Sequence, residues 1–239
     1  MRNLLVLTFI ALNMLFGQDH WETAVFADDI WRYIVPDSEP PSNWKDQSFD
    51  DSIWDEGEGG FGYGDDDDGT IVYQALSVYF RTTFNVEDIS KFTSAIISAD
   101  YDDGFIAYIN GYEIGRSYNL PEPGTFVPFD TQTFYDHEAS LYSGGLPESI
   151  LIDSLELNNI LVNGDNVFAV QLHNVSTSSS DMSGNFYLTF GIADDSEFYL
   201  DPPFWFQEPV VHDESNLPFI IIDTYVAEIP DEPRIPAYM

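Results

Sequence analysis

Apolar side chains recur at every second position through much of the chain, in short runs bounded by Gly, Pro, Asn and Asp. Alternation with a period of two is typical of β-strands, whereas a helix repeats its apolar positions every three and four residues. The runs are rich in Val, Ile, Phe, Tyr and Thr, which favour strands. The pattern predicts few, short helices, and strands at 31–35, 78–86, 95–99, 105–110, 112–116, 149–152, 167–174 and 186–192.

The most specific local signal is Asn110-Gly111, which lies between two apolar runs. Both residues accept the positive φ angles of a two-residue hairpin turn, so this segment predicts a β-hairpin. Asn163-Gly164 before the 167–174 strand is a second turn signal. Several short strands joined by such turns predict an all-β, jelly-roll β-sandwich, which we place over residues 18–192.

Residues 1–17 have the pattern of a secretory signal peptide, with the basic Arg2, an apolar run at 4–16 and the small Gly17. The run is shorter than the roughly 20 apolar residues that cross a bilayer, and no later segment is long enough. We therefore expect a secreted protein, extracellular or at the cell surface, without membrane insertion.

The alternation stops after residue 192. Residues 193–214 combine acidic residues, prolines and the run Phe204-Trp205-Phe206, which predicts an extended linker. Residues 215–239 contain an apolar strand flanked by prolines. Because a fold without staples usually needs about 40 residues, we interpret this tail as the truncated start of a second domain. The alternative, a strand added to an open edge of the sandwich, stays open.

The chain of 239 residues carries 7 Lys and Arg against 42 Asp and Glu, a formal net charge of −35. Such a surface repels phosphate backbones, so nucleic acids and anionic membranes are excluded as partners. The hydrophobic fraction of 44% and the aromatic fraction of 16% are far above a disordered composition and can form a core. The absence of Cys excludes disulfides and thiolate metal ligands.

Several motifs occur together in the chain: Phe49-Asp-Asp-Ser-Ile-Trp54, Gly60-Phe-Gly-Tyr-Gly64, Val78-Tyr-Phe-Arg81, Asp102-Asp-Gly-Phe-Ile-Ala-Tyr-Ile-Asn-Gly111, Arg116, Val170-Gln-Leu-His-Asn174 and Ser179-Ser-Asp181. In this order they resemble the galactose-binding-like β-sandwich modules of large secreted bacterial proteins, over about residues 31–192. The tail at 215–239 resembles the opening of the spore-coat-protein-H (CotH) kinase-like domain, which such modules often precede. The resemblance implies an accessory module whose C-terminal partner domain has its nucleotide-binding and catalytic residues beyond Met239.

Four consecutive carboxylates precede Gly69: Asp65, Asp66, Asp67 and Asp68. Hard oxygen ligands on a turn suit Ca²⁺, whose charge offsets their mutual repulsion. The helix-loop-helix calcium pattern is excluded, since its first and last positions would fall on Gly64 and Ala75, where acids are needed. Two interpretations stay open, a bound Ca²⁺ and a solvated acidic loop.

Asp102 and Asp103 directly precede the predicted hairpin. Their carboxylates are expected at one end of the sandwich, where loops gather and form binding sites. Arg116, at the end of the second hairpin strand, could pair with them. In the alternative, an aspartate caps the turn and Arg116 forms an ordinary ion pair.

His173, Asn174 and Asp181 flank a Ser-rich loop and could hydrogen-bond sugar hydroxyls, while Tyr63 or Trp54 stacks on the apolar face of the sugar. The alternative is a satisfied, partly buried histidine with aromatic side chains in the core. The loop also contains the residue types of a hydrolytic triad. However, no Gly-x-Ser-x-Gly motif surrounds its serines, and no catalytic residue is predicted.

These observations predict a secreted, non-catalytic binding module for carbohydrate or cell-surface recognition, the N-terminal accessory domain of a larger CotH kinase-like protein. One alternative is a purely structural spacer stabilised by Ca²⁺. Another is part of an atypical protein kinase whose catalytic residues lie beyond the chain.

Overall fold

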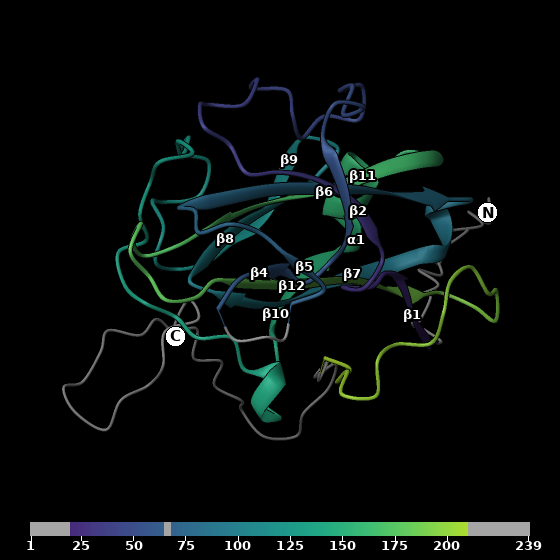
Figure 1. Cartoon of the computed structure of the whole chain (residues 1–239). Helices are drawn as coiled ribbons and strands as arrows, with labels where there is room; N and C mark the ends of the chain where they lie inside the picture. The colour runs from purple at the N-terminus through teal and green to yellow at the C-terminus, as the bar shows by residue number, and fades with distance from the viewer. Residues whose placement is uncertain (1–19, 65–67, 210–239) are drawn as a thin grey trace, which may run out of the picture.

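The computed structural model describes residues 20–64 and 68–209 and shows two antiparallel sheets packed face to face (Figure 1). The four-stranded sheet has the order β1 (His20–Val25), β12 (Ser183–Ile192), β7 (Phe92–Asp102), β10 (Glu148–Asp153). The six-stranded sheet has the order β3 (Asp55–Glu58), β2 (Ile30–Ile34), β6 (Ser77–Val86), β11 (Gly164–His173), β8 (Gly104–Ile109), β9 (Tyr112–Arg116). β4 (Phe61–Gly62) and β5 (Thr70–Ile71) form a short parallel pair. The predicted all-β jelly-roll sandwich is confirmed.

All eight predicted strands are present, and the elements that the pattern missed have identifiable reasons. β1 contains the buried Glu22, which interrupts the apolar alternation. β3 has no large apolar side chain and forms by pairing with β2. The single α-helix of the described residues, α1 (Ser154–Ile160), begins at Asp153, whose carboxylate accepts a hydrogen bond from the backbone N–H of Glu156. Short segments such as these carry too little sequence signal for a periodicity argument.

The predicted hairpin joins β8 and β9. Asn110 and Gly111 have φ angles of 50° and 89°, as the turn requires. The side chain of Asn110 donates to the carbonyl oxygen of Ile160 and accepts from the backbone N–H of Val167. The turn is therefore attached to α1 and to β11, and its geometry is fixed by tertiary contacts as well as by its own residues.

The main core lies between the sheets. Phe80 on β6 packs against Phe61, Trp31 and Phe186, with ring centroids 4.7, 5.3 and 5.7 Å away. The last of these contacts joins the two sheets directly. Burial of alternate side chains from both sheets is the interaction that the period of two predicted.

A second apolar cluster lies on the outer face of the six-stranded sheet. The loop before β3 places Trp44 and Trp54 over Tyr79 and Tyr108, with Trp44 edge-on to both tyrosines at 4.8 and 5.6 Å. The loop after β9 adds buried residues including Leu120. This outer cluster holds both loops against the sheet, where the loop before β3 lies at the top of Figure 1.

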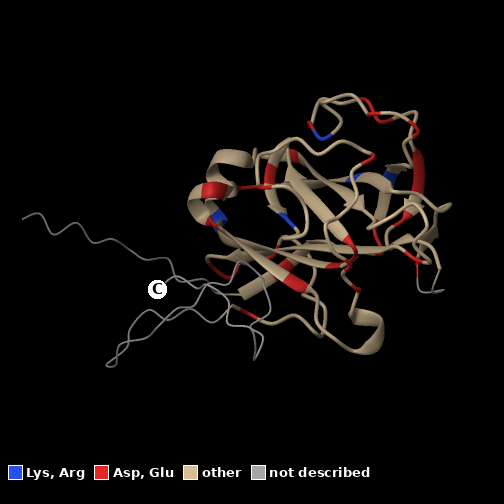
Figure 2. Cartoon of the chain, turned by 90° about the vertical axis from the view of Figure 1, so that its left-hand side faces the viewer, with Lys and Arg blue, Asp and Glu red and all other residues tan. Residues whose placement is uncertain are grey.

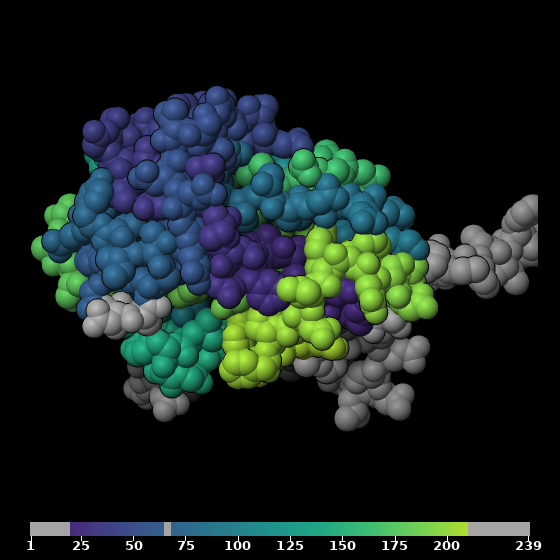
Figure 3. Space-filling model, turned by 45° about the vertical axis from the view of Figure 1, so that its right-hand side comes forward, coloured from purple at the N-terminus to yellow at the C-terminus, as the bar shows by residue number. Residues whose placement is uncertain are grey.

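Residues 193–209 pack against the four-stranded sheet (Figure 3). Leu200 forms a backbone bridge with Thr23, and Trp205 lies edge-on to Tyr187 at 4.9 Å. The buried carboxylate of Glu22 accepts hydrogen bonds from the backbone N–H groups at 198 and 199. This part of the predicted linker is thus attached along its length, although the domain boundaries at 192 and 214 stay predictions.

Several predictions concern residues outside the described ranges. They are the signal peptide at 1–17, the acidic residues at 65–67, and the CotH-like tail at 215–239. Among the described residues, no helix is long and apolar enough to cross a membrane.

We predict that Gly111→Ala destabilises the fold more than Gly124→Ala. Both glycines have positive φ, which costs an alanine roughly 1–2 kcal/mol. A Cβ at Gly111 would lie 2.4 Å from Oδ1 of Asp46, whereas one at Gly124 would meet nothing within 4 Å. Because Oδ1 is the end of a flexible side chain that can move aside, we expect a loss of roughly 1–2 kcal/mol in the free energy of unfolding at Gly124 and a somewhat larger loss at Gly111, measured by chemical denaturation. Equal losses would contradict this account of the turn.

Candidate functional site

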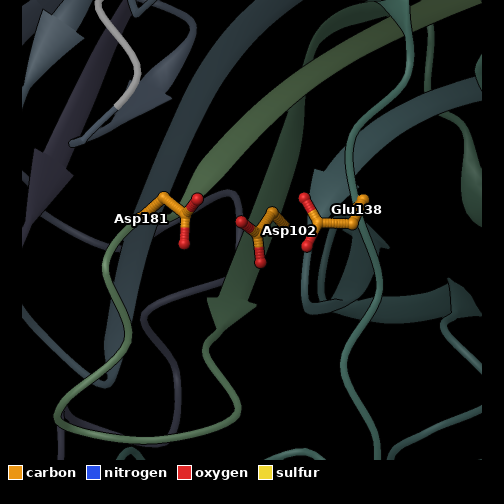
Figure 4. Close-up of side chains that lie close together, drawn as sticks. All are labelled: Asp102, Glu138 and Asp181. Carbon is orange, nitrogen blue, oxygen red and sulfur yellow. The ribbon is translucent and has the colours of Figure 1, made fainter.

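Three carboxylates from distant parts of the chain meet at one end of the sandwich (Figure 4). Asp102 ends β7, Glu138 lies in the loop before β10, and Asp181 lies in the loop between β11 and β12. One oxygen from each side chain lies within 4.8 Å of the others. Asp102 is buried, Asp181 is partly buried and Glu138 is exposed, so the cluster extends from the sheet end to the surface.

Buried carboxylates fasten the two loops to β7. Asp103, joined to Asp102 by a cis peptide bond, accepts hydrogen bonds from the backbone N–H groups of His137 and Val175 at 2.8 and 2.6 Å. Asp100 accepts from the backbone N–H of Ser140 at 2.7 Å. Because backbone donors replace the water that these charges lose, the loops that carry Glu138 and Asp181 are held in place.

Asp102 lacks backbone donors of this kind among the described hydrogen bonds. Burial raises the pKa of its carboxyl group to about 8, and the nearby Asp103, Asp181 and Glu138 raise it further in the same direction. Asp102 therefore holds its proton at higher pH than an ordinary carboxyl group does. A divalent cation would compete with that proton for the same oxygens.

Ser183 adds an oxygen beside the cluster. It is directly opposite Asp102 in the β7–β12 register, so both side chains lie on the same face of the sheet. Ser183 is 1% exposed, and its Oγ has no hydrogen-bond partner among the described residues. A buried hydroxyl without a partner is costly and is typical of a position that a ligand or ion completes.

The structure brings several of the sequence-predicted residues to this end. Asn174 is fully buried and donates to the hydroxyl oxygen of Tyr63 at 3.0 Å and to the carbonyl oxygen of Asp181 at 2.8 Å. Burial, together with the charges of Asp102 and Asp181, raises the pKa of Tyr63. Tyr63 and Asn174 thus support the loop that carries Asp181, with Tyr63 only 9% exposed.

His173 is fully buried behind the same loops. Its Nδ1 donates to the carbonyl oxygen of Thr131 at 2.8 Å, and Nε2 has no partner among the described residues. Burial lowers the pKa of the imidazole to about 4, so the ring is neutral at physiological pH. In this structure its ring is enclosed, which agrees with the alternative of a core histidine.

Trp54 and Arg116 lie apart from the three carboxylates. Trp54 is 5% exposed and packs on Trp44 in the outer cluster. Arg116 forms a bidentate ion pair with Glu113 at 2.6 and 2.7 Å, which is the ordinary pairing that the sequence left open. Neither side chain contributes to the cluster as the structure stands.

The predicted calcium ligands Asp65, Asp66 and Asp67 lie outside the described residues. Asp68 is described and lies against β4, since a Cβ built on Gly62 would be 2.3 Å from its Oδ1. A calcium site on this loop stays a prediction.

Sequence reasoning missed Glu138 and the exposed aromatic side chains near it. Tyr118, Phe134 and Tyr135 are 45%, 60% and 64% exposed. Asn119 fastens their loops to the end of β7 beside the cluster, because its side chain donates to the carbonyl oxygens of Asp103 and Tyr135. Aromatic and acidic residues crowd together at 134–138 in a segment without strand alternation, and this was the available signal.

A pocket with an acidic lining lies beside Glu138. This pocket of about 330 Å³ is lined by Asp100, His137, Glu138 and Glu148 among others. Figure 2 shows Asp and Glu widely distributed over the chain and Lys and Arg at few positions. An acceptor-rich site of this kind suits cations and hydroxyl donors.

The comparisons with known proteins find similarity to solved structures alone. No protein-family model and no curated protein matches the chain. A Bacteroides uniformis β-glucuronidase aligns with a TM-score of 0.45 and 15% identity, over 72% of this chain and 18% of that one. A Bifidobacterium dentium β-glucuronidase complexed with coumarin-3-O-glucuronide aligns with a TM-score of 0.42 and 14% identity, over 65% and 20%. A Bacteroides vulgatus β-glycosidase gives 0.39 and 17%, over 70% and 20%. The chain spans about a fifth of the length of these proteins.

We predict that Asp102→Asn stabilises the metal-free chain at high pH. The folded pKa of about 8 lies above the model value of 3.8, so the folded chain binds this proton more tightly than the unfolded chain. The stability that this proton gives to the folded chain is fully present below about pH 4 and is lost as the pH rises towards 8.

The variant, which stays neutral, should match the wild type near pH 4. In chelator at pH 8 its free energy of unfolding should exceed the wild-type value by roughly 3–5 kcal/mol, since about 1.4 kcal/mol is lost for each pH unit between the two pKa values. Denaturant titrations at both pH values test this, with the exposed Asp37→Asn as control. A difference that does not change with pH would contradict the burial argument.

Proposed function

We propose that this chain is a secreted, non-catalytic carbohydrate-binding module that uses Ca²⁺ at the loop end of its sandwich. Asp102, Glu138 and Asp181 are the proposed protein ligands of the ion. The exposed aromatic rings of Tyr118, Phe134 and Tyr135 contact the sugar. The signal-peptide pattern at 1–17 supports export.

The chemistry of the donor set supports calcium. Ca²⁺ takes 6–8 oxygen ligands and prefers carboxylates. Three carboxylates, with the hydroxyl of Ser183 beside them, leave coordination positions for backbone carbonyls, water or hydroxyls of a sugar. The raised pKa of Asp102 means that the ion displaces a proton when it binds at neutral pH.

The observation that carries the proposal is the combination of acceptors and exposed aromatic rings on loops that share one anchor. Asn119 and Asp103 hold the segments of Tyr135 and His137 beside the end of β7. Carbohydrate sites in general combine a ring that stacks on the apolar sugar face with polar groups that bind the hydroxyls. A pocket of about 330 Å³ adjoins Glu138 and is within the size range of small-ligand sites.

His173 and the serines of the neighbouring loop are residue types of a hydrolytic triad, but their placement supports a binding role over a catalytic one. His173 is enclosed, and its described hydrogen bond is to a backbone carbonyl. The hydroxyl of Ser178 lies 3.3 Å from that of Ser176, within its own loop. A nucleophile requires a base within hydrogen-bond reach. The described contacts do not place His173 in that position.

The context of a larger protein rests on the resemblance of residues 215–239 to a CotH kinase-like domain. We propose that the module positions that partner domain on a glycan or cell surface. Sequencing the reading frame past Met239 tests this part separately.

Calcium titration by calorimetry and binding to a glycan array test the module itself. We expect one Ca²⁺ site that is weakened at least 10-fold by Asp181→Asn and left unchanged by Asp37→Asn. Glycan binding should be lost in chelator and reduced by Tyr135→Ala.

Calcium binding without any glycan binding would favour the structural spacer instead. Failure to bind either would overturn the proposal, and release of reducing sugar from a bound glycan would contradict its non-catalytic part.

A further inference from the structure

A second cleft, of about 350 Å³, lies on the six-stranded sheet. It opens between the loop before β3, seen at the top of Figure 1, and strands β2, β3 and β6. Its polar and aromatic lining consists chiefly of Arg32, Gln47, Phe49, Asp51, Glu56 and Arg81. The carboxylate cluster contributes none of these residues.

Two arginines lie side by side in this cleft. Arg32 on β2 is directly opposite Arg81 on β6, so their side chains share the outer face of the sheet. The chain has only 7 Lys and Arg in all. Like charges directly opposite one another destabilise a sheet unless other charges compensate. Here Asp51 pairs with Arg81 at 2.6 Å and Glu56 pairs with Arg32 at 3.4 Å.

Arg81 forms the rigid side of the cleft. Its side chain is 3% exposed and donates to the backbone carbonyls of Phe49 and Asp46 at 3.1 and 2.8 Å. Its Nε has no hydrogen-bond partner among the described residues. The guanidinium also lies 5.4 Å from the centre of the Phe49 ring. Arg81 thus holds the loop and the aromatic ring in place at the cost of one unused donor.

Arg32 and Glu56 form the open side. Their side chains are 38% and 57% exposed, and their 3.4 Å ion pair is long. Such an exposed pair contributes little to stability. The pair therefore presents a planar set of donors next to a carboxylate acceptor, with both groups accessible to a ligand.

We propose that this cleft is a second ligand site, which binds one neutral sugar residue without a metal ion. Each sugar hydroxyl both donates and accepts a hydrogen bond, and the cleft offers guanidinium donors beside carboxylate acceptors. The two arginines are balanced by Asp51 and Glu56, and the chain carries a net charge of −35, so an acidic sugar is disfavoured. Phe49 supplies the apolar contact, and the volume is within the range of small-ligand sites.

The test uses chelator throughout, so that the proposed calcium-dependent site cannot bind glycan. The full chain is titrated with methyl glycosides of glucose, galactose and mannose, and with glucuronate, and binding is followed by protein-observed NMR. We expect millimolar or tighter binding of at least one neutral glycoside, weakened at least 10-fold by Arg32→Ala and by Glu56→Gln.

Lys91→Ala is the matched control, because Lys91 is also ion-paired and its side chain is 34% exposed. It and Asp181→Asn should bind like the wild type. Thermal melting checks that each variant is folded. If Arg32→Ala is not folded, the result for Glu56→Gln decides the test.

The proposal is overturned if no neutral glycoside binds, if folded variants bind as the wild type does, or if glucuronate binds best. If Asp181→Asn loses calcium-dependent glycan binding but still binds the neutral glycoside in chelator, the two sites are separate.

Discussion

A buried carboxylate needs hydrogen-bond donors, and this constraint organises the segments around the four-stranded sheet. Glu22, Asp100 and Asp103 are 4%, 4% and 2% exposed, and each accepts hydrogen bonds from two backbone N–H groups of a distant segment. Glu22 thereby fastens residues 198–199. The two aspartates fasten the loops at 137–141 and 175. Sheet packing builds the core, and these acids attach the loops to it.

Asp102 is the exception to this arrangement, and its position explains why the loop end is the candidate site. It is as buried as its neighbours but faces Asp181 and Glu138 in place of backbone donors. A proton or a cation can relieve the resulting repulsion. The raised pKa of Asp102 and the unpartnered hydroxyl of Ser183 are two signs of the same unsatisfied requirement. A site that the rest of the fold holds rigid and leaves incomplete is well prepared to bind a ligand.

The two proposed ligand sites differ in how the chain handles its negative charge. At the loop end, carboxylates are concentrated, and a proton or a cation relieves their repulsion. On the six-stranded sheet, two of the few arginines balance two carboxylates within one cleft, so that both donors and acceptors are present. The first site, as proposed, depends on metal, whereas the second needs no group from outside the protein. One module could hold a glycan at two separate points, which raises the effective affinity for a polymer.

The sequence by itself determined the all-β class, the eight main strands and the Asn110-Gly111 hairpin. Alternation and turn chemistry are local properties that neighbouring residues encode. It also indicated Asp102, Asp103, Asn174 and Asp181, since residues next to strand ends gather at the ends of a sandwich.

Only the tertiary structure decided how those residues are used. Asp103 is satisfied by backbone donors while the adjacent Asp102 is not, a difference that depends on loops 34 or more positions away along the chain. Contacts between distant segments also bring Glu138 into the cluster and enclose Trp54 and His173. Burial and partners are set by long-range packing, which periodicity does not record.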